Sequence, residues 1–432
     1  MSIVTKFGGS SLADASQILK MKSIVLTNTA RKFIVPSAPG KRFSSDIKIT
    51  DMLYYLQSNQ AEEIYLKIKE RYSEIRNELN LEFDIEKYID KIFQDIKDGA
   101  NADYAASRGE YLNALLIADL MGWDFVDAKD IIFFDATGVL DMEKTIKQGA
   151  KILKEHENAV IPGFYGSLPN GKIKTFSRGG SDISGAIIAA ATNAELYENW
   201  TDVSGFLKAD PRIVKDAEKI DLITYRELRE LSYMGATVLH ADSIFPVLTA
   251  GIPINVRNTN NPEDSGTLIV PEIENEDLME ENITGIAGKK NFTVITIDKN
   301  GMNAEIGFGR KILSCLEKFK LPFEHIPSSI DTVCVVIEDC HIADSLHDLI
   351  EEIHIQCEPD SVEIQDNMAL IATVGRSMIR RIGISAKLFT ALAESNVNVR
   401  MIDQGSSEIN IIVGVENEDF EKAVNAIYKA LV

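Results

Sequence analysis

The sequence has little cysteine and no long hydrophobic run. Its 432 residues include four cysteines, none in a CxxC pair. Few cysteines in a long chain favour reduced thiols in a cytoplasmic protein. His347 and His354 match no zinc-binding spacing either, so we expect no metal site in the protein itself. The longest apolar run, near Gly185–Ala191, is far shorter than the ~20 residues that span a bilayer. The first residues show no signal-peptide pattern, so we expect no contact with a membrane.

Positive charge is also scarce. Lys and Arg total 45 against 66 Asp and Glu, which gives a formal net charge of −21. Nucleic acid is therefore not expected as a partner, because binding to its phosphates requires a basic surface. Any anionic substrate must be held by local cations against an acidic background. The length and a hydrophobic fraction of 45% indicate two or three domains with ordinary cores.

Short apolar strands alternate with helices over residues 1–270. We expect strands at Ile3–Phe7, Phe33–Val35, Ile131–Phe134 and Ala159–Gly163. Helices are expected over 51–97, Tyr104–Leu120 and Asp182–Glu195. This alternation predicts an α/β domain whose mostly parallel sheet is covered by helices on both faces.

An internal repeat follows an acidic stretch, residues 271–282, which we interpret as a linker. Shifting the sequence by 76 residues gives a nearly gap-free match, in which Ile306 and Gly307 recur as Ile382 and Gly383. Each copy reads strand, helix, strand, strand, helix, and the first copy ends with a further strand at Ser361–Ile364. The second copy lacks that strand, so we expect residues 283–288 to supply it. The predicted modules are then 283–366 and 367–432.

Two glycine-rich turns carry the first chemical signal. One is Lys6–Ser11, directly after a strand, and the other is Ser177–Asp182, which opens an Ala-rich helix. Glycines let backbone N–H groups approach phosphate oxygens, and a helix N-terminus adds partial positive charge. Lys6 could reach a transferring phosphoryl group, although no GxxxxGK[ST] motif is present. A plain tight turn explains the first motif as well, and a first-turn acid explains Asp182.

Three further patterns suit small-molecule binding. Arg178 presents a planar fork that fits a carboxylate. Glu110, in an Arg-Gly-Glu triplet at the expected start of a helix, could pair with an ammonium group or could be an ordinary first-turn carboxylate. The segments Trp200–Gly205 and Ala209–Arg212 place Thr, Asp and Arg in loops. Such loops suit nucleotide contacts or are simply polar turns.

The order of these motifs is that of one enzyme family. KFGGSS, RGE, SRGGSD, WTDVSG, ADPR and MGATVLH occur in the order typical of aspartate kinases, and the C-terminal repeats resemble paired ACT modules. The chain thus resembles the aspartate kinases of the amino acid kinase family over nearly its whole length. The resemblance implies a three-layer amino acid kinase domain followed by two ferredoxin-like ACT modules. It also implies ATP-dependent phosphorylation of L-aspartate to 4-phospho-L-aspartate, the first step toward lysine, threonine, methionine and diaminopimelate.

The same resemblance implies residue roles. Lys6 and Asp182 would be catalytic, with Asp182 orienting Lys6. The residues that would bind aspartate are Ser37, Thr50, Glu110, Arg178 and Ser181. The residues that would bind ATP are Lys6, Gly8, Gly9, Ser10, Thr201, Asp202, Arg212, Thr237 and Val238. Mg²⁺ would be held mostly through the ATP phosphates. No general base is needed, because the acceptor carboxylate is ionised at neutral pH.

Regulation would belong to the repeats. An amino acid effector, lysine with threonine as a second candidate, would be surrounded by Met302, Phe323, Glu324, Ser328, Ser329 and Asp331. The modules would pair subunits into a homodimer or homotetramer. Two alternatives stay open, because the chain has Thr237 where the family usually has Lys, and Ala241 where Pro is frequent. These are another carboxylate kinase of the same family and a catalytically weak amino acid sensor.

Overall fold

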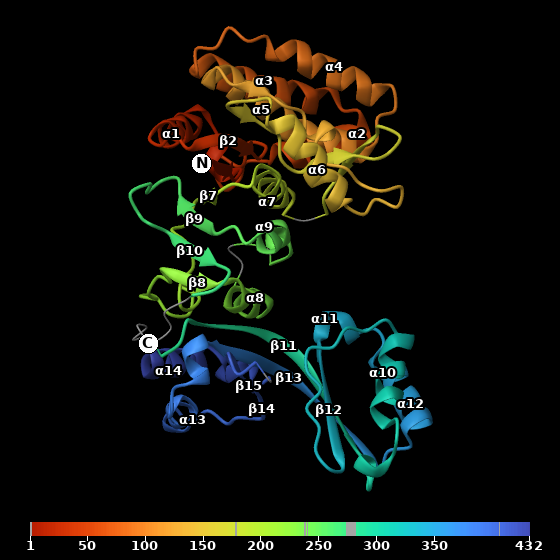
Figure 1. Ribbon diagram of the computed structural model, residues 1–432. Helices are drawn as coiled ribbons and strands as arrows, with labels where there is room; N and C mark the ends of the chain where they lie inside the picture. Colours follow the sequence, from red (N-terminus) through yellow and green to blue (C-terminus); the bar gives the residue numbers. More distant parts are fainter. Residues whose placement is uncertain (1, 178, 237–238, 240, 274–281, 406) are drawn as a thin grey trace. The chain divides into compact units, whose positions relative to one another are not determined.

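The computed structural model describes residues 2–177, 179–236, 239, 241–273, 282–405 and 407–432 (Figure 1). The chain divides into two compact units. The first comprises Met1–Phe206, Lys219–Leu228 and Thr237–Glu274, and the second comprises Leu207–Glu218, Arg229–Ala236 and Asn275–Val432. Two short stretches of the expected catalytic domain therefore pack with the C-terminal residues. The domain boundaries drawn from the sequence remain predictions.

An eight-stranded sheet forms the centre of the first unit. Its order is β3-β4-β2-β1-β7-β9-β10-β8, and of the described pairs only β9 and β10 are antiparallel. The strands are β1 (Ile3–Phe7), β2 (Arg31–Pro36), β3 (Asp124–Phe125), β4 (Ala159–Val160), β7 (Leu196–Thr201), β8 (Leu222–Thr224), β9 (Ile254–Asn258) and β10 (Thr267–Val270). A separate hairpin joins β5 (Tyr165–Ser167) and β6 (Ile173–Thr175). The mostly parallel sheet expected from the alternating pattern is confirmed.

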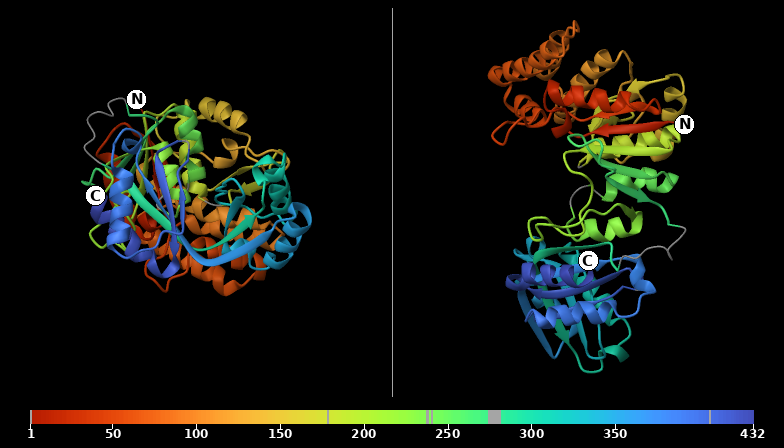
Figure 2. Two further views of the ribbon diagram at one scale, coloured as in Figure 1. Left: turned by 90° about the horizontal axis from the view of Figure 1, so that it is seen from below. Right: turned by 90° about the vertical axis from the view of Figure 1, so that its left-hand side faces the viewer.

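Helices cover both faces of this sheet (Figures 1 and 2). Neighbouring residues of a strand point to opposite faces, and all five residues of β1 are buried. Phe7 lies in a core with the helices α1 (Ala15–Leu26), α2 (Ile49–Asn59), α3 (Glu62–Glu78), α4 (Ile85–Lys97) and α5 (Ala102–Met121). Lys6 points the other way, to the layer that holds α6 (Met142–Leu153), α7 (Gly180–Thr192) and α9 (Phe245–Ala250).

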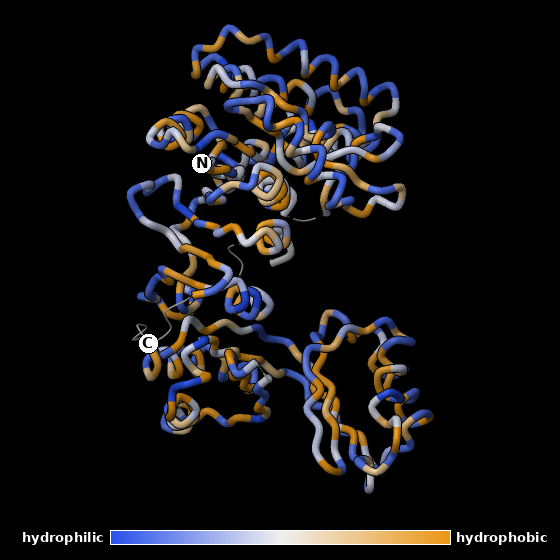
Figure 3. The backbone as a smooth tube through the Cα atoms, in the orientation of Figure 1, coloured by the Kyte–Doolittle hydropathy of each residue, from blue (hydrophilic) through white to orange (hydrophobic). Residues whose placement is uncertain are grey.

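Capping and periodicity explain where these helices form. Asp14, Asp84 and Asp141 each accept a hydrogen bond from the backbone N–H three residues on, at 2.9, 3.2 and 3.0 Å, and so begin α1, α4 and α6. Hydrophilic and hydrophobic residues alternate along α4 (Figure 3), whose buried side chains recur at three- and four-residue steps. A polar outer face with an apolar inner stripe is what a helix at the edge of a domain requires.

One sequence expectation is corrected in this unit. The strand expected at Ile131–Phe134 is wrong, because only isolated bridges join Phe133 to Ser167 and Phe134 to Leu140. The segment runs between tight turns, so its apolar residues are buried without a partner strand to extend along. The helical region expected over 51–97 is confirmed and consists of three helices, separated near Gln60 and Asn80, which take positive φ angles of 49° and 55°.

The second unit has a five-stranded antiparallel sheet in the order β12-β11-β13-β15-β14. Its strands are β11 (Gly285–Asp298), β12 (Thr332–Glu338), β13 (Ser361–Val374), β14 (Met401–Asp403) and β15 (Asn410–Glu416). Residues 285–290 of β11 pair with 369–374 of β13, which also pairs with β15. The rest of β11 pairs with β12 and with the start of β13. One long strand pair therefore serves both copies of the repeat.

Helix positions confirm the 76-residue repeat. α10 (Phe308–Lys318) and α13 (Ile384–Glu394) have the same length and follow glycines in the left-handed region, Gly307 at φ 87° and Gly383 at φ 94°. The remaining helices are α11 (Asp339–Ile342), α12 (Leu346–Cys357) and α14 (Phe420–Leu431). One difference separates the copies, because the segment of the first copy that corresponds to β14 forms only isolated bridges, at His325 and Ser328.

Each copy has its own hydrophobic core. α10, α11 and α12 pack with β12 and the second half of β11. α13 and α14 pack with β13, β15 and the first half of β11. Ala209 and Val214 belong to this second core, which explains why residues 207–218 pack with the C-terminal unit.

A buried ion pair crosses the first sheet. Arg31 of β2 donates from Nε and Nη2 to the two carboxylate oxygens of Glu198 on β7, at 2.8 and 3.0 Å. The indole N–H of Trp200 donates to the same carboxylate at 2.9 Å. The side chains of Arg31 and Glu198 are 6% and 3% exposed, so each charge depends on the other.

Glu198→Ala should destabilise the first unit by about 3–5 kcal/mol, because it leaves the Arg31 guanidinium buried without its counter-charge. Both tryptophans of the chain, Trp123 and Trp200, lie in this unit, so their fluorescence during urea unfolding follows its stability. The exposed Glu195→Ala is the control and should change stability by less than about 0.5 kcal/mol. Equal effects of the two substitutions would contradict a structural role for the pair.

Candidate active site

The centre of the candidate site is Lys6, at the carboxyl end of β1. Its Nζ lies 2.6 Å from Asp182 Oδ1 and donates to Asn199 Oδ1 at 3.2 Å. Asn199 in turn donates from Nδ2 to the same Asp182 oxygen at 2.9 Å. Lys6 is 7% exposed, and a buried cation of this kind needs such partners. The three side chains tie β1, β7 and the first turn of α7 together.

The two glycine turns flank this amine. After β1 the chain enters a short 3₁₀ turn, Ser10–Leu12, and the Gly8 N–H donates to the Trp200 carbonyl at 2.9 Å. A Cβ on Gly8 would lie 3.7 Å from Lys6 Nζ, so the turn runs directly beside the amine. On the other side stand Ser181, which is buried, and Asp182, both in the first turn of α7. An anion between the turns would meet the Lys6 charge and a helix N-terminus.

Glu110 is a buried carboxylate with a free oxygen. The sequence placed it at a helix start, but α5 begins earlier, where Asn101 caps it by accepting from the Tyr104 N–H at 2.9 Å. Glu110 is therefore an interior helix residue and not a first-turn acid. Burial raises its pKa to about 8, although a backbone hydrogen bond from Ala38 opposes this. Its Oε2 has no partner among the described residues, which leaves room for a cationic ligand group.

Arg108 of the same motif has a structural role. Its guanidinium lies over the rings of Tyr104, Tyr111 and Tyr165, at 4.6, 4.5 and 5.0 Å from their centroids. It is 5% exposed and donates to Ser107 Oγ. The faces of the three aromatic rings stabilise the buried guanidinium by cation–π interactions.

Other predicted residues lie at the carboxyl ends of neighbouring strands. The Ser37 N–H donates to the Phe7 carbonyl at 3.0 Å, which holds the end of β2 beside the end of β1. Thr50 is half-buried in the first turn of α2. Thr201 ends β7 and donates from Oγ1 to Asp202 Oδ1 at 3.2 Å. Because parallel strands bring these ends to one edge, the sheet gathers much of the predicted site.

Four further residues of the predicted site have no position at this edge in the described structure. Arg212 belongs to the second unit, where its exposed guanidinium pairs with Asp210 at 2.5 Å. Arg178, Thr237 and Val238 lie outside the described residues. The roles that the resemblance gives these four remain predictions.

Asn199 is a site residue that the sequence analysis missed. It pairs directly with Lys6 in the register of β1 and β7. The signal was a polar residue at a buried position of β7, but it becomes informative only once β7 is known to lie beside β1.

One cluster in the second unit has metal-ligand chemistry. The ligand atoms of Glu338, Cys340 and His341 all lie within 4.8 Å of one another. Cys340 and His341 are exposed, and none of the three is a buried polar atom without a partner. We therefore assign no metal ion to this cluster.

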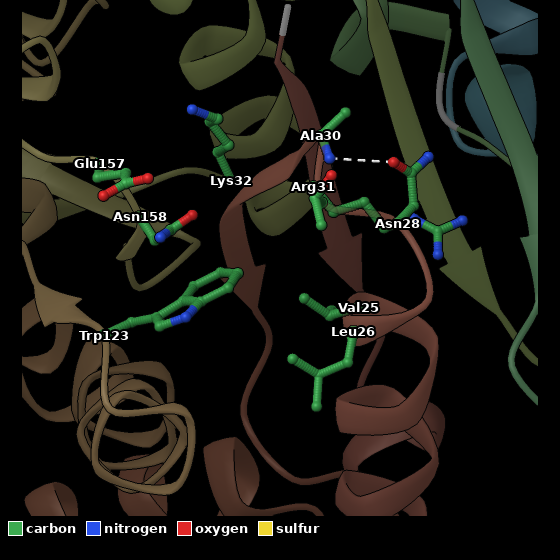
Figure 4. A pocket seen from close by; sticks show the side chains of 10 residues that line it. Val25, Leu26, Asn28, Ala30, Arg31, Lys32, Trp123, Glu157 and Asn158 are labelled. Carbon is green, nitrogen blue, oxygen red and sulfur yellow. Dashed lines mark hydrogen bonds between the residues drawn. The ribbon is translucent and has the colours of Figure 1, made fainter.

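A cavity of about 550 Å³ opens elsewhere in the first unit (Figure 4). It lies where β2 begins, at the strand end opposite the glycine turns, and Figure 4 shows Trp123, Lys32 and Glu157 around it. Arg31 contributes a buried guanidinium to the cavity, but this group already donates to the Glu198 carboxylate. The cavity is therefore separate from the candidate site.

Among the described residues, no helix is both long enough and apolar enough to cross a membrane.

Comparisons with known proteins now identify the family. The model of the amino acid kinase family matches residues 1–258, and an ACT domain model matches residues 371–431. Aspartokinase 3 of Bacillus subtilis is 39% identical over 99% of this chain and 98% of its own length. The chain belongs to the aspartokinases. As an aspartokinase it is an enzyme of the ATP-dependent kinases, and its ACT-containing C-terminal unit is typical of the family.

Solved aspartokinases share the fold. The aspartate kinase of Clostridium acetobutylicum is 55% identical, with a TM-score of 0.90 over 100% of this chain and 99% of its own. Aspartokinase III of E. coli is 26% identical and covers the whole chain. Its complex with aspartate and ADP gives a TM-score of 0.79, and its complex with lysine and aspartate gives 0.75.

Glu110 makes the stability of this aspartokinase depend on pH. Its pKa is about 8 in the folded protein against 4.5 in the unfolded chain, so its contribution to stability is fully present below about pH 4.5. That contribution is lost as the pH rises toward 8, because only the unfolded chain can ionise freely.

Glu110→Gln should remove this loss. Without ligands, the free energy of unfolding of the variant should increase relative to that of the wild type between pH 5 and pH 8. The gain should be at most about 1.4 kcal/mol for each pH unit of this window, and smaller near pH 8, where the folded protein begins to ionise Glu110. Urea unfolding followed by tryptophan fluorescence at the two pH values measures it. The exposed Glu155→Gln should show no such gain, and a Glu110→Gln variant that behaves likewise would contradict a buried, uncharged Glu110.

Proposed function

We propose that this aspartokinase transfers the γ-phosphate of ATP to the β-carboxylate of L-aspartate, giving 4-phospho-L-aspartate and ADP. The observation that carries the proposal is the Lys6 ammonium, fixed by Asp182 and Asn199 between two glycine turns. The acceptor carboxylate is already ionised at neutral pH, so the reaction requires no general base. It requires two anions placed in line and the transferred charge neutralised.

Lys6 supplies that neutralisation in the proposed reaction. Its charge acts where negative charge develops, and its geometry is set in advance by Asp182 and Asn199, so little reorganisation is needed. Gly8, Gly9 and Ser10 would form the turn against the ATP phosphates. The N–H groups of Gly9 and Ser10 would face the phosphates, because the Gly8 N–H already donates to the Trp200 carbonyl. Thr201, Asp202, Arg212, Thr237 and Val238 would hold the rest of the nucleotide.

Aspartate recognition rests on Glu110 in this proposal. Its unpaired Oε2 would accept from the substrate ammonium, while Arg178 would take the α-carboxylate. Ser37, Thr50 and Ser181 would complete the aspartate site. An ammonium beside Glu110 favours its ionised form, so aspartate binding would release a proton below about pH 8.

Mg²⁺ is the cation proposed to accompany ATP. The fit is through the nucleotide, because one Asp182 oxygen already binds Lys6 and Asn199, and the Asp202 side chain, directly after β7, is exposed. Few protein carboxylates are thus left, which suits an ion bound mainly by phosphates and water. When bound it would neutralise phosphate charge.

Lysine, with threonine as a second candidate, is the proposed effector, acting at the loops around Met302 and Phe323–Asp331. Gly301 donates its N–H to Asp331 Oδ1 at 2.7 Å, and Lys299 donates to the Asp331 carbonyl at 2.8 Å, so the two loops form one surface. Met302 is buried in the core below. Ser328, Ser329 and Phe323 would line the site with these residues. The lysine complex of E. coli aspartokinase III supports this choice of ligand.

Glu324 is the proposed partner of the effector's ammonium group. Burial, together with a hydrogen bond to the Glu324 carboxylate, raises the pKa of Tyr233 in α8 (Tyr225–Tyr233). An ammonium that takes over this carboxylate would change what Tyr233 bonds to, and α8 directly precedes the Met234–His240 motif.

Pairing of subunits through the ACT modules is the proposed assembly, as a homodimer or homotetramer. Ile306 and Ile382 stand at equivalent positions of the two copies, and both are fully exposed. A large apolar side chain wholly in water at the same place in each copy supports a contact there.

A comparison of acceptors tests the activity. ADP release is measured with L-aspartate, L-glutamate and N-acetylglutamate side by side, and we expect turnover with aspartate alone. Turnover with one of the other acids but not aspartate would make the protein another carboxylate kinase. No turnover with any of them would favour an amino acid sensor.

Lys6→Ala should lower kcat with aspartate by at least about a hundredfold while the protein stays folded, because the charge of Lys6 matters most in the transition state. Steady-state kinetics and circular dichroism check both statements. Lys32→Ala, on the neighbouring strand but at its far end, is the control and should keep wild-type kcat. A Lys6→Ala enzyme with more than about a tenth of wild-type kcat would remove Lys6 from the mechanism.

Glu324→Gln should weaken inhibition by lysine at least about tenfold, because it removes the charge proposed to meet the effector's ammonium but keeps an acceptor for Tyr233. The concentration of lysine that halves the rate measures this. Glu317→Gln, an exposed acid on α10, should leave that concentration unchanged. If the wild type ignores millimolar lysine and threonine alike, the loops have no such effector and the modules serve assembly only.

A further inference from the structure

A charged side chain interrupts the buried stripe of α3. The buried residues of this helix are Ile68, Arg71, Tyr72 and Ile75, which follow the three- and four-residue steps of an inward-facing stripe. The Arg71 side chain is only 4% exposed. An arginine in such a place is costly unless its donors are used, so what they bind indicates why it is there.

The Arg71 guanidinium joins three segments around the glycine turn. Nη2 donates to the carbonyls of Ala13, at 2.6 Å, and Gly40, at 2.9 Å. Nη1 donates to Asp46 Oδ2 at 2.7 Å. Ala13 directly follows the 3₁₀ turn that Gly8 and Gly9 lead into. Gly40 and Asp46 belong to the loop that starts at Ser37. One planar group therefore fixes both loops.

The two loops also touch each other. The Gly40 N–H donates to the Gly9 carbonyl at 2.8 Å, and a Cβ on Gly40 would lie 2.6 Å from the Gly9 carbonyl carbon. Because the backbones at Gly9 and Gly40 are in direct contact, a shift of one loop moves the other. Although burial of Asp46 opposes it, hydrogen bonds from Arg42 and Arg71 hold the pKa of Asp46 well below its usual range.

The next residue of α3 reaches the other side of the site. Tyr72 is fully buried, and its hydroxyl donates to the Gly109 carbonyl at 2.8 Å. Gly109 precedes Glu110, and a Cβ on it would lie 2.8 Å from the Ala38 Cβ. α5 is therefore held at this point between Tyr72 and the loop after β2.

We infer that α3 is the positioning helix of the active site. Arg71 fixes the loops that meet the phosphates, and Tyr72 fixes the part of α5 that carries Glu110. Neither residue touches a reacting group, and both act through backbone carbonyls. The inference rests on the proposed function, because it assigns the two contacts to the phosphate side and the ammonium side of that reaction.

The fork geometry makes lysine a poor replacement for Arg71. A guanidinium offers several donors in one plane and can meet three acceptors at once, whereas an ammonium is a single point on a flexible stem. Arg71→Lys should therefore keep the charge and lose the alignment. Tyr72→Phe should remove one hydrogen bond and leave the packing of the ring.

The test separates kcat from KM in neighbouring variants. Arg71→Lys should lower kcat with aspartate by about tenfold to a hundredfold with the aspartate KM within about threefold of wild type. Tyr72→Phe should raise the aspartate KM by at least about threefold with kcat nearly unchanged. Arg76→Lys is the matched control on the same helix, where Arg76 pairs with Glu86 near the surface, and should leave both constants unchanged.

Folding and chemistry are distinguished by two further measurements. All variants are assayed at a temperature where tryptophan fluorescence shows each to be folded. Arg71→Ala, if folded, should recover activity when guanidinium ion is added at non-denaturing concentration, which a merely structural loss would not do. If the wild type makes no ADP with aspartate, the proposed function fails. If the wild type is active and Arg71→Lys matches it, or if both variants change kcat and KM alike, the positioning role is overturned.

Discussion

The buried contact between Lys6 and Asp182 is the constraint on which the first unit depends. A lysine inside a parallel sheet must be neutralised, and here the counter-charge comes from the first turn of the helix on that face, with Asn199 joining the two. The strand end, the helix start and the neighbouring strand are thereby fixed together. The contacts that stabilise the buried ammonium in the fold are the same ones that, in the proposed reaction, direct it toward the phosphoryl group.

Glu110 differs from Lys6, because its buried carboxyl group is not fully paired within the described residues. Among the described residues nothing binds its Oε2, and burial of the carboxyl group raises its pKa. In the proposed reaction, the ammonium group of the amino acid substrate would supply the positive charge that pairs with this carboxylate. Such a pairing would favour acceptors with a free ammonium group over N-acetylated ones.

Much of the fold and of the candidate site could be predicted from the sequence. The residues that could not be predicted have one feature in common. The sheet class, the 76-residue repeat and the chemistry of Lys6 and Asp182 are local signals, carried by periodicity and by short motifs. Asn199 and Arg71 are not, because their importance comes from the strand beside β1 and from loops that are far from α3 in the sequence. The Glu110 triplet was recognised but misplaced within its helix, since the cap at Asn101 lies before the motif.

The continuous strands β11 and β13 have a consequence for how the C-terminal unit is made. Residues 285–290 must meet 369–374 before the second module has its full sheet, yet the whole first module lies between them in the chain. The second module therefore cannot be completed from its own residues, and its ladder closes only through contacts that are distant in sequence. A chain cut between the two modules leaves the first with its three strands and deprives the second of the strand at residues 285–290.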